Sequence, residues 1–166
     1  VGNNNTIDNS NNSTANDLTN GGGNLIMGNN NIIDNSGETM NNVNVVIGTT
    51  NQVGAGEQNL ILGTSNQNFG SHNILFGSNN TNGLYQTTFD KEIGKDFSGN
   101  YSFIYGNNNK VFVPKNKTLE GVFIAGNNNT LDVSGSSYVT SNNRGYVLLG
   151  SYAGISGENP TSPHTS

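Results

Sequence analysis

The sequence predicts an all-β protein whose chain winds into a column of short stacked coils, and three observations support this fold class. The first is composition, because 35 asparagines and 23 glycines among 166 residues favour turns and disfavour helix interiors. The second is a unit of three apolar residues followed by glycine, which recurs along the whole chain. The third is the shortest spacing of these units, 14 to 15 residues, which is too short for repeats that contain a helix.

The apolar triplets predict the first strand of each coil. Successive side chains on a strand point to opposite faces, so three apolar residues in a row predict a strand that is covered on both faces. A truncated unit, Val1-Gly2, precedes seven complete ones. With their glycines, the complete units occupy residues 25–28, 45–48, 60–63, 74–77, 103–106, 123–126 and 147–150.

A second, shorter strand is predicted after each glycine. Asparagine stands three residues after the glycine in seven of the eight units, and an apolar residue stands five after it in six. This alternation predicts a strand with one buried face, and Asn68 and Asn82 interrupt its apolar column. We expect the asparagines to form a hydrogen-bonded ladder. The glycines should mark positive φ angles or close backbone contacts.

The glycines are separated by steps of 14 to 29 residues. A long step indicates either one coil with a loop insertion or two coils of which one is degenerate. In both cases the pattern predicts a single domain over residues 1–156. Residues 157–166, with two prolines and several small polar residues, read as a tail or linker.

The doubly apolar first strand also predicts self-association. A coil of two strands has one interior and covers only one face of that strand, so the other face needs a cover from outside. Because the pattern persists along the chain, an identical chain is the simplest cover, and we predict an obligate homo-oligomer. Either the central column of the triplets or the pair of columns flanking it faces the partners. The central column comprises Ile26, Val46, Ile61, Leu75, Ile104, Ile124 and Leu148.

Composition and motifs argue against several function classes. Six Lys and Arg in a chain of net charge −5 argue against binding to nucleic acid or anionic lipid, and no apolar run reaches the roughly 18 residues of a membrane span. Cysteine is absent, and His72 and His164 have no partner motif. Aspartate follows the second apolar column in only three coils, which does not indicate a calcium-binding repeat. We therefore expect no catalysis, no cofactor and no metal.

The insertions carry the residues that could contact a receptor. Phe89, Ile93 and Phe97 are four residues apart, as on one face of a short helix, and aromatic side chains dominate binding hot spots. The region around residues 39–43 adds apolar side chains outside the strand columns. The candidate receptor-binding residues are Tyr85, Phe89, Phe97, Tyr101, Met40 and Val43.

The repeat resembles the YadA-like heads of bacterial trimeric autotransporter adhesins. Residues 59–66 (Asn-Leu-Ile-Leu-Gly-Thr-Ser-Asn) and 73–80 (Asn-Ile-Leu-Phe-Gly-Ser-Asn-Asn) follow that family's unit of about 14 residues, with Asn where the family commonly has Ser. The likeness covers roughly residues 1–156. It implies a left-handed parallel β-roll that forms a homotrimer. It also implies a location at the bacterial cell surface, anchored in the outer membrane through regions outside this chain.

In function, the resemblance implies a non-catalytic head that attaches the bacterium to a host-cell receptor. The Asn-rich composition is similar to heads of fusobacterial adhesins that bind host CEACAM receptors. The competing hypothesis is a structural spacer of a fibrous surface protein or of a phage tail fibre. A spacer needs no aromatic residues outside its strand columns, whereas this chain has several.

Overall fold

The computed structural model of the protein is all-β and contains parallel sheets, as the sequence predicts. It describes residues 1–8, 23–34, 43–54, 56–83, 97–113, 117–133 and 144–156. Within these ranges, no helix is long and apolar enough to cross a membrane. The predicted tail, residues 157–166, lies outside the described residues.

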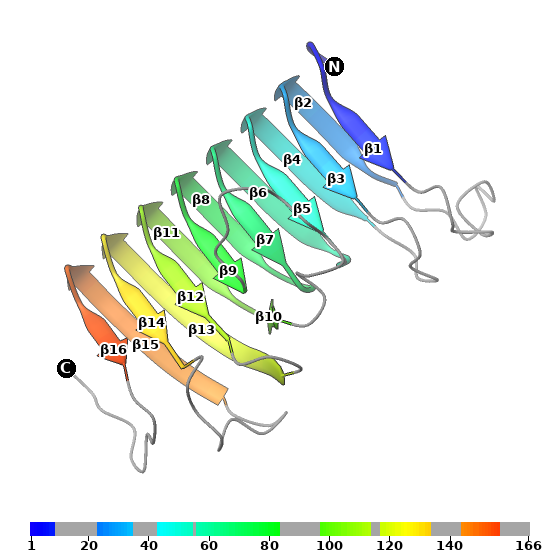
Figure 1. The fold of residues 1–166 in the computed structure, drawn as a ribbon. Coiled ribbons are helices and arrows are strands. Elements are labelled where there is room, and N and C mark those ends of the chain that lie inside the picture. The colour runs from blue at the N-terminus through cyan, green and yellow to red at the C-terminus, as the bar shows by residue number, and fades with distance from the viewer. Residues whose placement is uncertain are drawn as a thin grey trace.

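The strands form two sheets that face each other (Figure 1). The short-strand sheet contains eight strands of three residues each: β1 (Thr6–Asp8), β3 (Ile32–Asp34), β5 (Gln52–Gly54), β7 (Gln67–Phe69), β9 (Thr81–Gly83), β12 (Lys110–Phe112), β14 (Thr130–Asp132) and β16 (Gly154–Ser156). The long-strand sheet contains β2 (Leu25–Asn29), β4 (Asn44–Thr49), β6 (Asn59–Thr64), β8 (Ile74–Ser78), β10 (Phe97–Asn100), β11 (Phe103–Asn107), β13 (Lys117–Asn127) and β15 (Arg144–Ser151).

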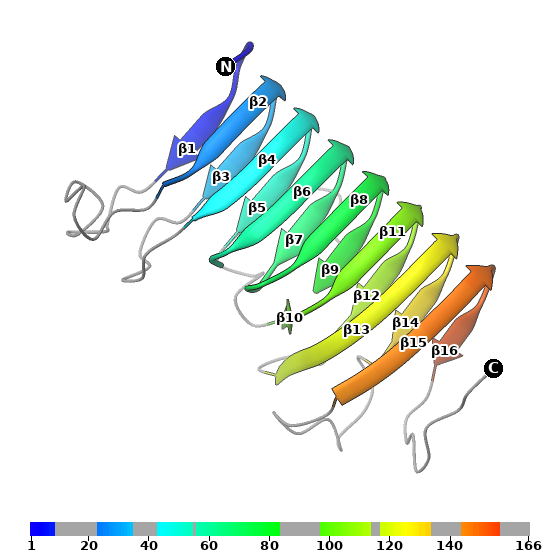
Figure 2. The same ribbon diagram turned by 180° about the vertical axis from the view of Figure 1, so that it is seen from behind.

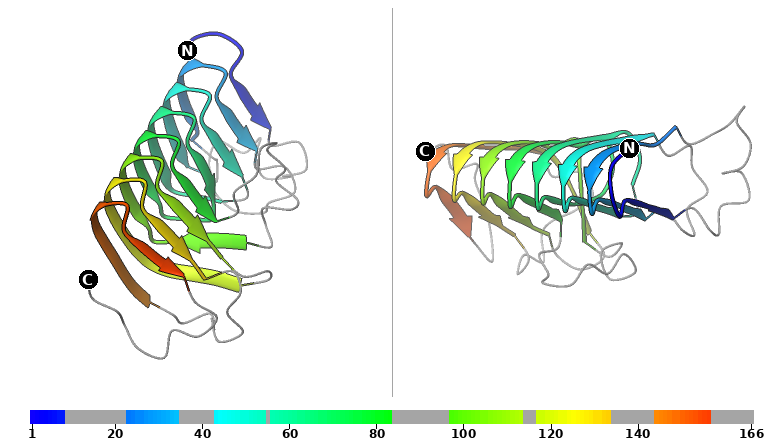
Figure 3. Two further views of the ribbon diagram at one scale, coloured as in Figure 1. Left: turned by 60° about the vertical axis from the view of Figure 1, so that its left-hand side comes forward. Right: turned by 90° about the horizontal axis from the view of Figure 1, so that it is seen from above.

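The chain alternates between the two sheets, except that β10 and β11 follow one another in the long-strand sheet, and every strand pair in each sheet is parallel (Figures 1 and 2). The glycines of the apolar units pair with one another along the long-strand sheet, Gly48 with Gly63 and Gly63 with Gly77. Gly77 also pairs directly with Gly106 across the longest step. Each long step therefore adds one coil with an insertion and not two coils. The coils follow one another from the N-terminus at one end of the stack to the C-terminus at the other (Figure 3).

The two kinds of connection between strands differ in length. Every connection from a long strand to the following short strand has two residues, whereas the connections from a short strand to the next long-strand-sheet strand range from four residues to sixteen. Because all strands are parallel, each kind begins and ends along its own edge of the paired sheets. We call these the tight-turn edge and the loop edge.

Glycine at the tight-turn edge is required by backbone contact and by backbone conformation. A Cβ atom on Gly63 would lie 1.8 Å from the carbonyl oxygen of Gly77, and φ at Gly63 is +130°. The same contact recurs where the glycines of successive coils meet. Both expectations for the glycine column are confirmed, because no residue with a side chain allows the coils to approach this closely.

The predicted asparagine ladder is confirmed along the same edge. The Asn51 side-chain amide donates to Asn31 Oδ1 at 3.0 Å and to the carbonyl oxygen of Gly63 at 2.8 Å. The bonds thus link each asparagine to the coil before it and to the coil after it. The ladder ends at Ala153, whose side chain has no amide group. Only the backbone N–H of Ala153 takes part, by donating to Asn129 Oδ1. Its members are Asn5, Asn31, Asn51, Asn66, Asn80, Asn109 and Asn129.

A second asparagine ladder runs along the loop edge, and the sequence analysis missed it. Asn59 donates from Nδ2 to Asn44 Oδ1 at 2.9 Å and to the carbonyl oxygen of Gly70 at 3.0 Å. Asn73 continues the ladder, and Ser102 donates its backbone N–H to Asn73 Oδ1. The sequence feature that could have indicated this ladder is an Asn directly before four of the apolar triplets.

The core lies between the sheets and consists mainly of aliphatic side chains. One layer is polar, because Asn68 and Asn82 are fully buried where the apolar column is interrupted. Asn82 donates to Asn68 Oδ1 at 3.1 Å and to the carbonyl oxygen of Gly99 at 3.1 Å. A Cβ atom on Gly99 would lie 2.2 Å from Asn82 Oδ1, so this buried pair needs glycine beside it. The amides replace a hydrophobic contact by hydrogen bonds between neighbouring coils.

The helical spacing proposed for the longest insertion is wrong for Phe97. This residue begins strand β10, which pairs in parallel with the first part of β13 from Phe97–Lys117 to Asn100–Glu120. A short isolated helix is marginal in water, whereas pairing with an adjacent strand satisfies the backbone groups. Phe89 and Ile93 lie outside the described residues.

Substitution of two glycines in the same column tests the close-contact explanation. We expect Gly63→Ala to lower the free energy of unfolding by at least about 2 kcal/mol more than Gly150→Ala, because both add backbone strain but only Gly63 has a carbonyl oxygen in the way. Urea unfolding at one protein concentration measures the difference. Equal losses would show that positive φ alone requires glycine.

Removal of one ladder amide tests the contribution of the hydrogen bonds. The Asn66 side chain donates to Asn51 Oδ1 and to the Gly77 carbonyl oxygen, and it accepts from the backbone and side-chain N–H groups of Asn80. Asn66→Ala leaves these buried groups unpaired, so we expect a loss of about 3 kcal/mol in thermal unfolding. The exposed Thr64, in the same coil, provides the control, and Thr64→Ala should cost about 0.5 kcal/mol or less. Similar losses for both variants would contradict the ladder's role.

Candidate functional site: two interaction surfaces

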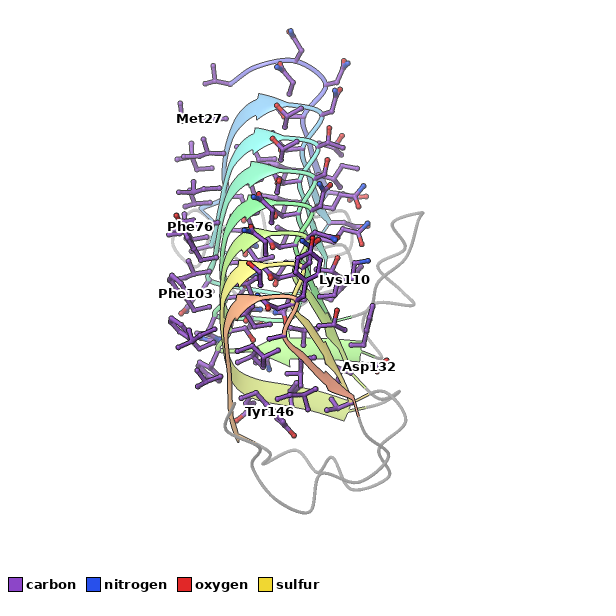
Figure 4. All side chains as sticks on the ribbon, turned by 90° about the vertical axis from the view of Figure 1, so that its left-hand side faces the viewer. Met27, Phe76, Phe103, Lys110, Asp132 and Tyr146 are labelled. Atoms are coloured by element: carbon purple, nitrogen blue, oxygen red, sulfur yellow. The ribbon has the colours of Figure 1, made fainter. Side chains whose placement is uncertain are left out.

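The outer surface of the long-strand sheet is an apolar face built from two columns of side chains. Each triplet places its first and third residues outward, and strand pairing keeps them in register from coil to coil. One column contains Leu25, Val45, Leu60, Ile74, Phe103, Phe123 and Val147, and the other contains Met27, Ile47, Leu62, Phe76, Tyr105, Ala125 and Leu149. Met27, Phe76 and Phe103 project from this side in Figure 4.

Many side chains of the apolar face are exposed to solvent in the single chain. Leu25 is 45% exposed, Val147 53% and Leu149 61%. The aromatic residues near the middle pack on one another, with Phe103 stacked on Phe123 at a centroid distance of 5.2 Å and edge-on to Phe76 at 6.0 Å. A contiguous apolar surface of this extent is typical of a protein interface.

The opposite outer surface, on the short-strand sheet, is largely polar. Lys110 and Asp132 project from that side in Figure 4. Gln67 donates from Nε2 to Gln52 Oε1 at 3.0 Å, so polar side chains there bond across neighbouring coils. The short-strand sheet also places Ile32 and Phe112 in its outward columns, between polar residues. Among the described strands, a continuous apolar outer surface is carried by the long-strand sheet.

The structure places the central column of the triplets inside the coils. Every member is buried, with at most 5% of its surface exposed in the single chain. These side chains belong to the hydrophobic core between the sheets and do not face outward. Of the two interface alternatives, the flanking columns are therefore the ones that can contact a partner. The central column consists of Ile26, Val46, Ile61, Leu75, Ile104, Ile124 and Leu148.

The loop edge is the second candidate surface. Three of the candidate receptor-binding residues fall there within the described ranges: Val43 directly before β4, Phe97 at the start of β10 and Tyr101 shortly before β11. Val43 is 43% exposed and Tyr101 is 58% exposed. Strands β4 and β11 are three strand positions apart, which corresponds to about 14 Å. Met40, Tyr85 and Phe89 lie outside the described residues.

Tyr101 makes a contact that the sequence analysis did not anticipate. Its ring stacks on His72, with centroids 4.7 Å apart and an angle of 21° between the planes. Both residues have positive φ and stand at the same position of successive turns, directly before Asn73 and Ser102. The sequence feature that could have indicated this contact is that both residues stand two positions before an apolar triplet.

The described residues offer little for chemistry that requires charged or metal-binding groups. They include no group of three or more His, Asp or Glu side chains that could hold a metal ion. Burial raises the pKa of Tyr146, which packs against the core at the C-terminal end of the stack. Tyr146 is on the inner side and away from the apolar face. The two surfaces are thus suited to contacts with other molecules.

No protein-family model matches the chain. A search of curated proteins likewise finds no match.

Proposed function

We propose that the protein is a non-catalytic, homotrimeric head of a bacterial cell-surface adhesin. The observation that carries this proposal is the apolar face, which extends over seven coils and is not covered by the described residues of its own coils. Burial of one large aliphatic or aromatic side chain contributes about 1.5–3 kcal/mol, so the face strongly favours association. Further copies of the chain supply a cover of matching length and matching pattern. The likeness of the repeat to YadA-like heads supports an assembly of three copies, and it also supports a left-handed β-roll.

The role in attachment is supported by the separation of the apolar face from the loop edge. The apolar face consists of aliphatic and aromatic side chains on strands in regular register, whereas all variation in connection length falls on the loop edge. Functional residues concentrate on loops that a rigid scaffold positions. We propose that the loop edge contacts a host-cell surface protein, with the CEACAM receptors as the candidates that the resemblance suggests. The location is the bacterial surface, with anchoring through regions outside this chain.

A charge placed on each outer surface of the same coil tests the assembly. Phe123 in β13 belongs to the apolar face, and Thr130 in β14 projects from the polar side. Phe123→Glu should produce smaller species in sedimentation velocity at micromolar concentration, because it buries an unpaired carboxylate in the interface. Thr130→Glu should stay assembled. A native protein that is a folded monomer at this concentration would overturn the proposal of a trimer.

Attachment is tested with labelled protein on cultured host cells and with purified CEACAM ectodomain. The paired changes Met40→Ala with Val43→Ala, and Phe89→Ala with Phe97→Ala, each remove apolar side chains from insertions. If one pair contains the anchor, affinity should fall about thirtyfold, equivalent to about 2 kcal/mol. Thr64→Ala, in a coil without a long insertion, is the control.

Three results are decisive for attachment. Loss of binding in one loop-edge pair, with an unchanged melting temperature, supports the proposal. Full binding of both pairs together with loss in Thr64→Ala would show that the wrong surface was chosen. A native trimer that binds neither cells nor receptor would favour the structural spacer.

A further inference from the structure

At one position of the loop edge, two coils carry an aromatic side chain although the backbone conformation there favours glycine or asparagine. The residue two before each triplet has positive φ in five successive coils, with values from +54° to +90°. In the equivalent column at the tight-turn edge, five of eight residues are asparagine, which tolerates this conformation well. At the loop edge the residues are Gln58, His72, Tyr101, Gly121 and Gly145.

The order of these five residues leaves one face of the Tyr101 ring open. Asn100 pairs with Glu120, and Phe103 with Phe123, so Tyr101 is aligned with Gly121. Gly121 in turn is aligned with Gly145, because the residues on either side of it pair with Arg144 and Tyr146. Among the residues that the structure describes, His72 covers one face of the ring, and neither glycine places a side chain over the other.

The ring orientation follows from the stacking geometry. The centroid distance of 4.7 Å between His72 and Tyr101 equals the spacing of adjacent strands, about 4.8 Å, and the rings are nearly parallel. The two rings are therefore stacked along the column of coils, and the face of Tyr101 away from His72 lies on the side of the two glycine positions. The side chain is 58% exposed, as expected for a ring covered on one side only. We call the free ring face and the two glycines the Tyr101 shelf.

We propose that the Tyr101 shelf binds one ring of a neutral saccharide. Pyranoses present a face of C–H groups that packs on the electron-rich face of an aromatic ring, while their hydroxyl groups bond to surrounding polar atoms. Tyr101 differs from Tyr152, the other exposed tyrosine with positive φ, in that its ring is held by a stack on His72 and is aligned with two glycines.

The surroundings of the shelf favour a saccharide over an apolar peptide. The residues directly before the two glycines are polar, because Glu120 precedes Gly121 and pairs with Arg144, which precedes Gly145. On the His72 side, Asn100 Oδ1 accepts from the Ser71 backbone N–H at 2.8 Å. An apolar peptide anchor requires a contiguous apolar pocket, whereas a single ring beside polar residues suits a polyhydroxylated ligand. The formal charges of Glu120 and Arg144 cancel, so this pair favours a neutral ligand over a charged one. The inference rests on the proposed attachment function and names a ligand class for its loop edge.

The experiment uses saturation-transfer NMR on the whole assembled protein. The probes are neutral oligosaccharides that end in galactose, glucose, mannose or N-acetylglucosamine. At least one should bind the native protein, and Tyr101→Ala should weaken it about tenfold. Tyr101→Phe should retain binding, since it keeps the ring. Gly121→Asn should also weaken binding, because asparagine tolerates positive φ and its side chain would occupy the shelf.

Tyr152→Ala is the matched control, because Tyr152 has φ +60° at the equivalent turn position of the other edge and is 81% exposed. It should leave saccharide binding unchanged. If Tyr101→Ala fails to fold, Tyr101→Asn removes the ring while keeping a residue suited to the turn. Circular dichroism and sedimentation confirm that each variant is intact.

Several outcomes would overturn the shelf. These are the absence of binding to any probe, unchanged binding after loss of the Tyr101 ring, and an equal loss in Tyr152→Ala. Binding of a proline-rich peptide that depends on Tyr101, with no saccharide bound, would show that the ligand class is wrong. Attachment to host cells without saccharide binding would reject the shelf and leave the proposed function standing. Saccharide binding without attachment to host cells would reject the proposed function and leave the shelf standing.

Discussion

The close backbone contact between successive glycines is the constraint on which the rest of the structure depends. At Gly28, Gly48, Gly63, Gly77 and Gly106, the space for a Cβ atom is occupied by the carbonyl oxygen of the next coil's glycine, at 1.8 to 1.9 Å. A shift of one coil along the next would bring a residue with a side chain against this carbonyl oxygen. The contact therefore holds neighbouring coils in one alignment. The asparagine of each turn then bonds to the coil before it and to the coil after it. A single register thus passes along the whole stack.

This register explains why the apolar side chains gather on an outer surface. Strands of one sheet in fixed register place equivalent residues side by side, so the first and third residues of each triplet form continuous columns. The middle residue fills the core in every coil. The interior of the coils is therefore complete without the flanking columns, and their apolar area is left for another molecule. The polar outer surface of the short-strand sheet has no such excess.

The same register allows the connections at the loop edge to vary in length and sequence. The tight-turn edge always uses two residues to return the chain, while the loop edge accepts connections of four to sixteen residues without disturbing the pairing of the glycines. Equivalent positions of successive coils there carry side chains of very different size, namely Gln58, His72, Tyr101, Gly121 and Gly145. A position whose side chain is not part of the core can change at little cost to the fold. The loop edge is for this reason the part of the molecule best suited to specific recognition.

The sequence by itself determined the two strands of each repeat, the need for glycine and the first asparagine ladder, because these depend on local residue types that recur at fixed spacing. It also limited the outward columns to two choices. Only the tertiary structure decided between them, since the direction of a side chain on a doubly apolar strand depends on which side the second sheet lies. The strand at Phe97 and the stack of Tyr101 on His72 were likewise beyond local patterns. Both arise from pairing between residues far apart in the chain, Phe97 with Lys117 and His72 with Tyr101, and that pairing exists only once the coils are stacked.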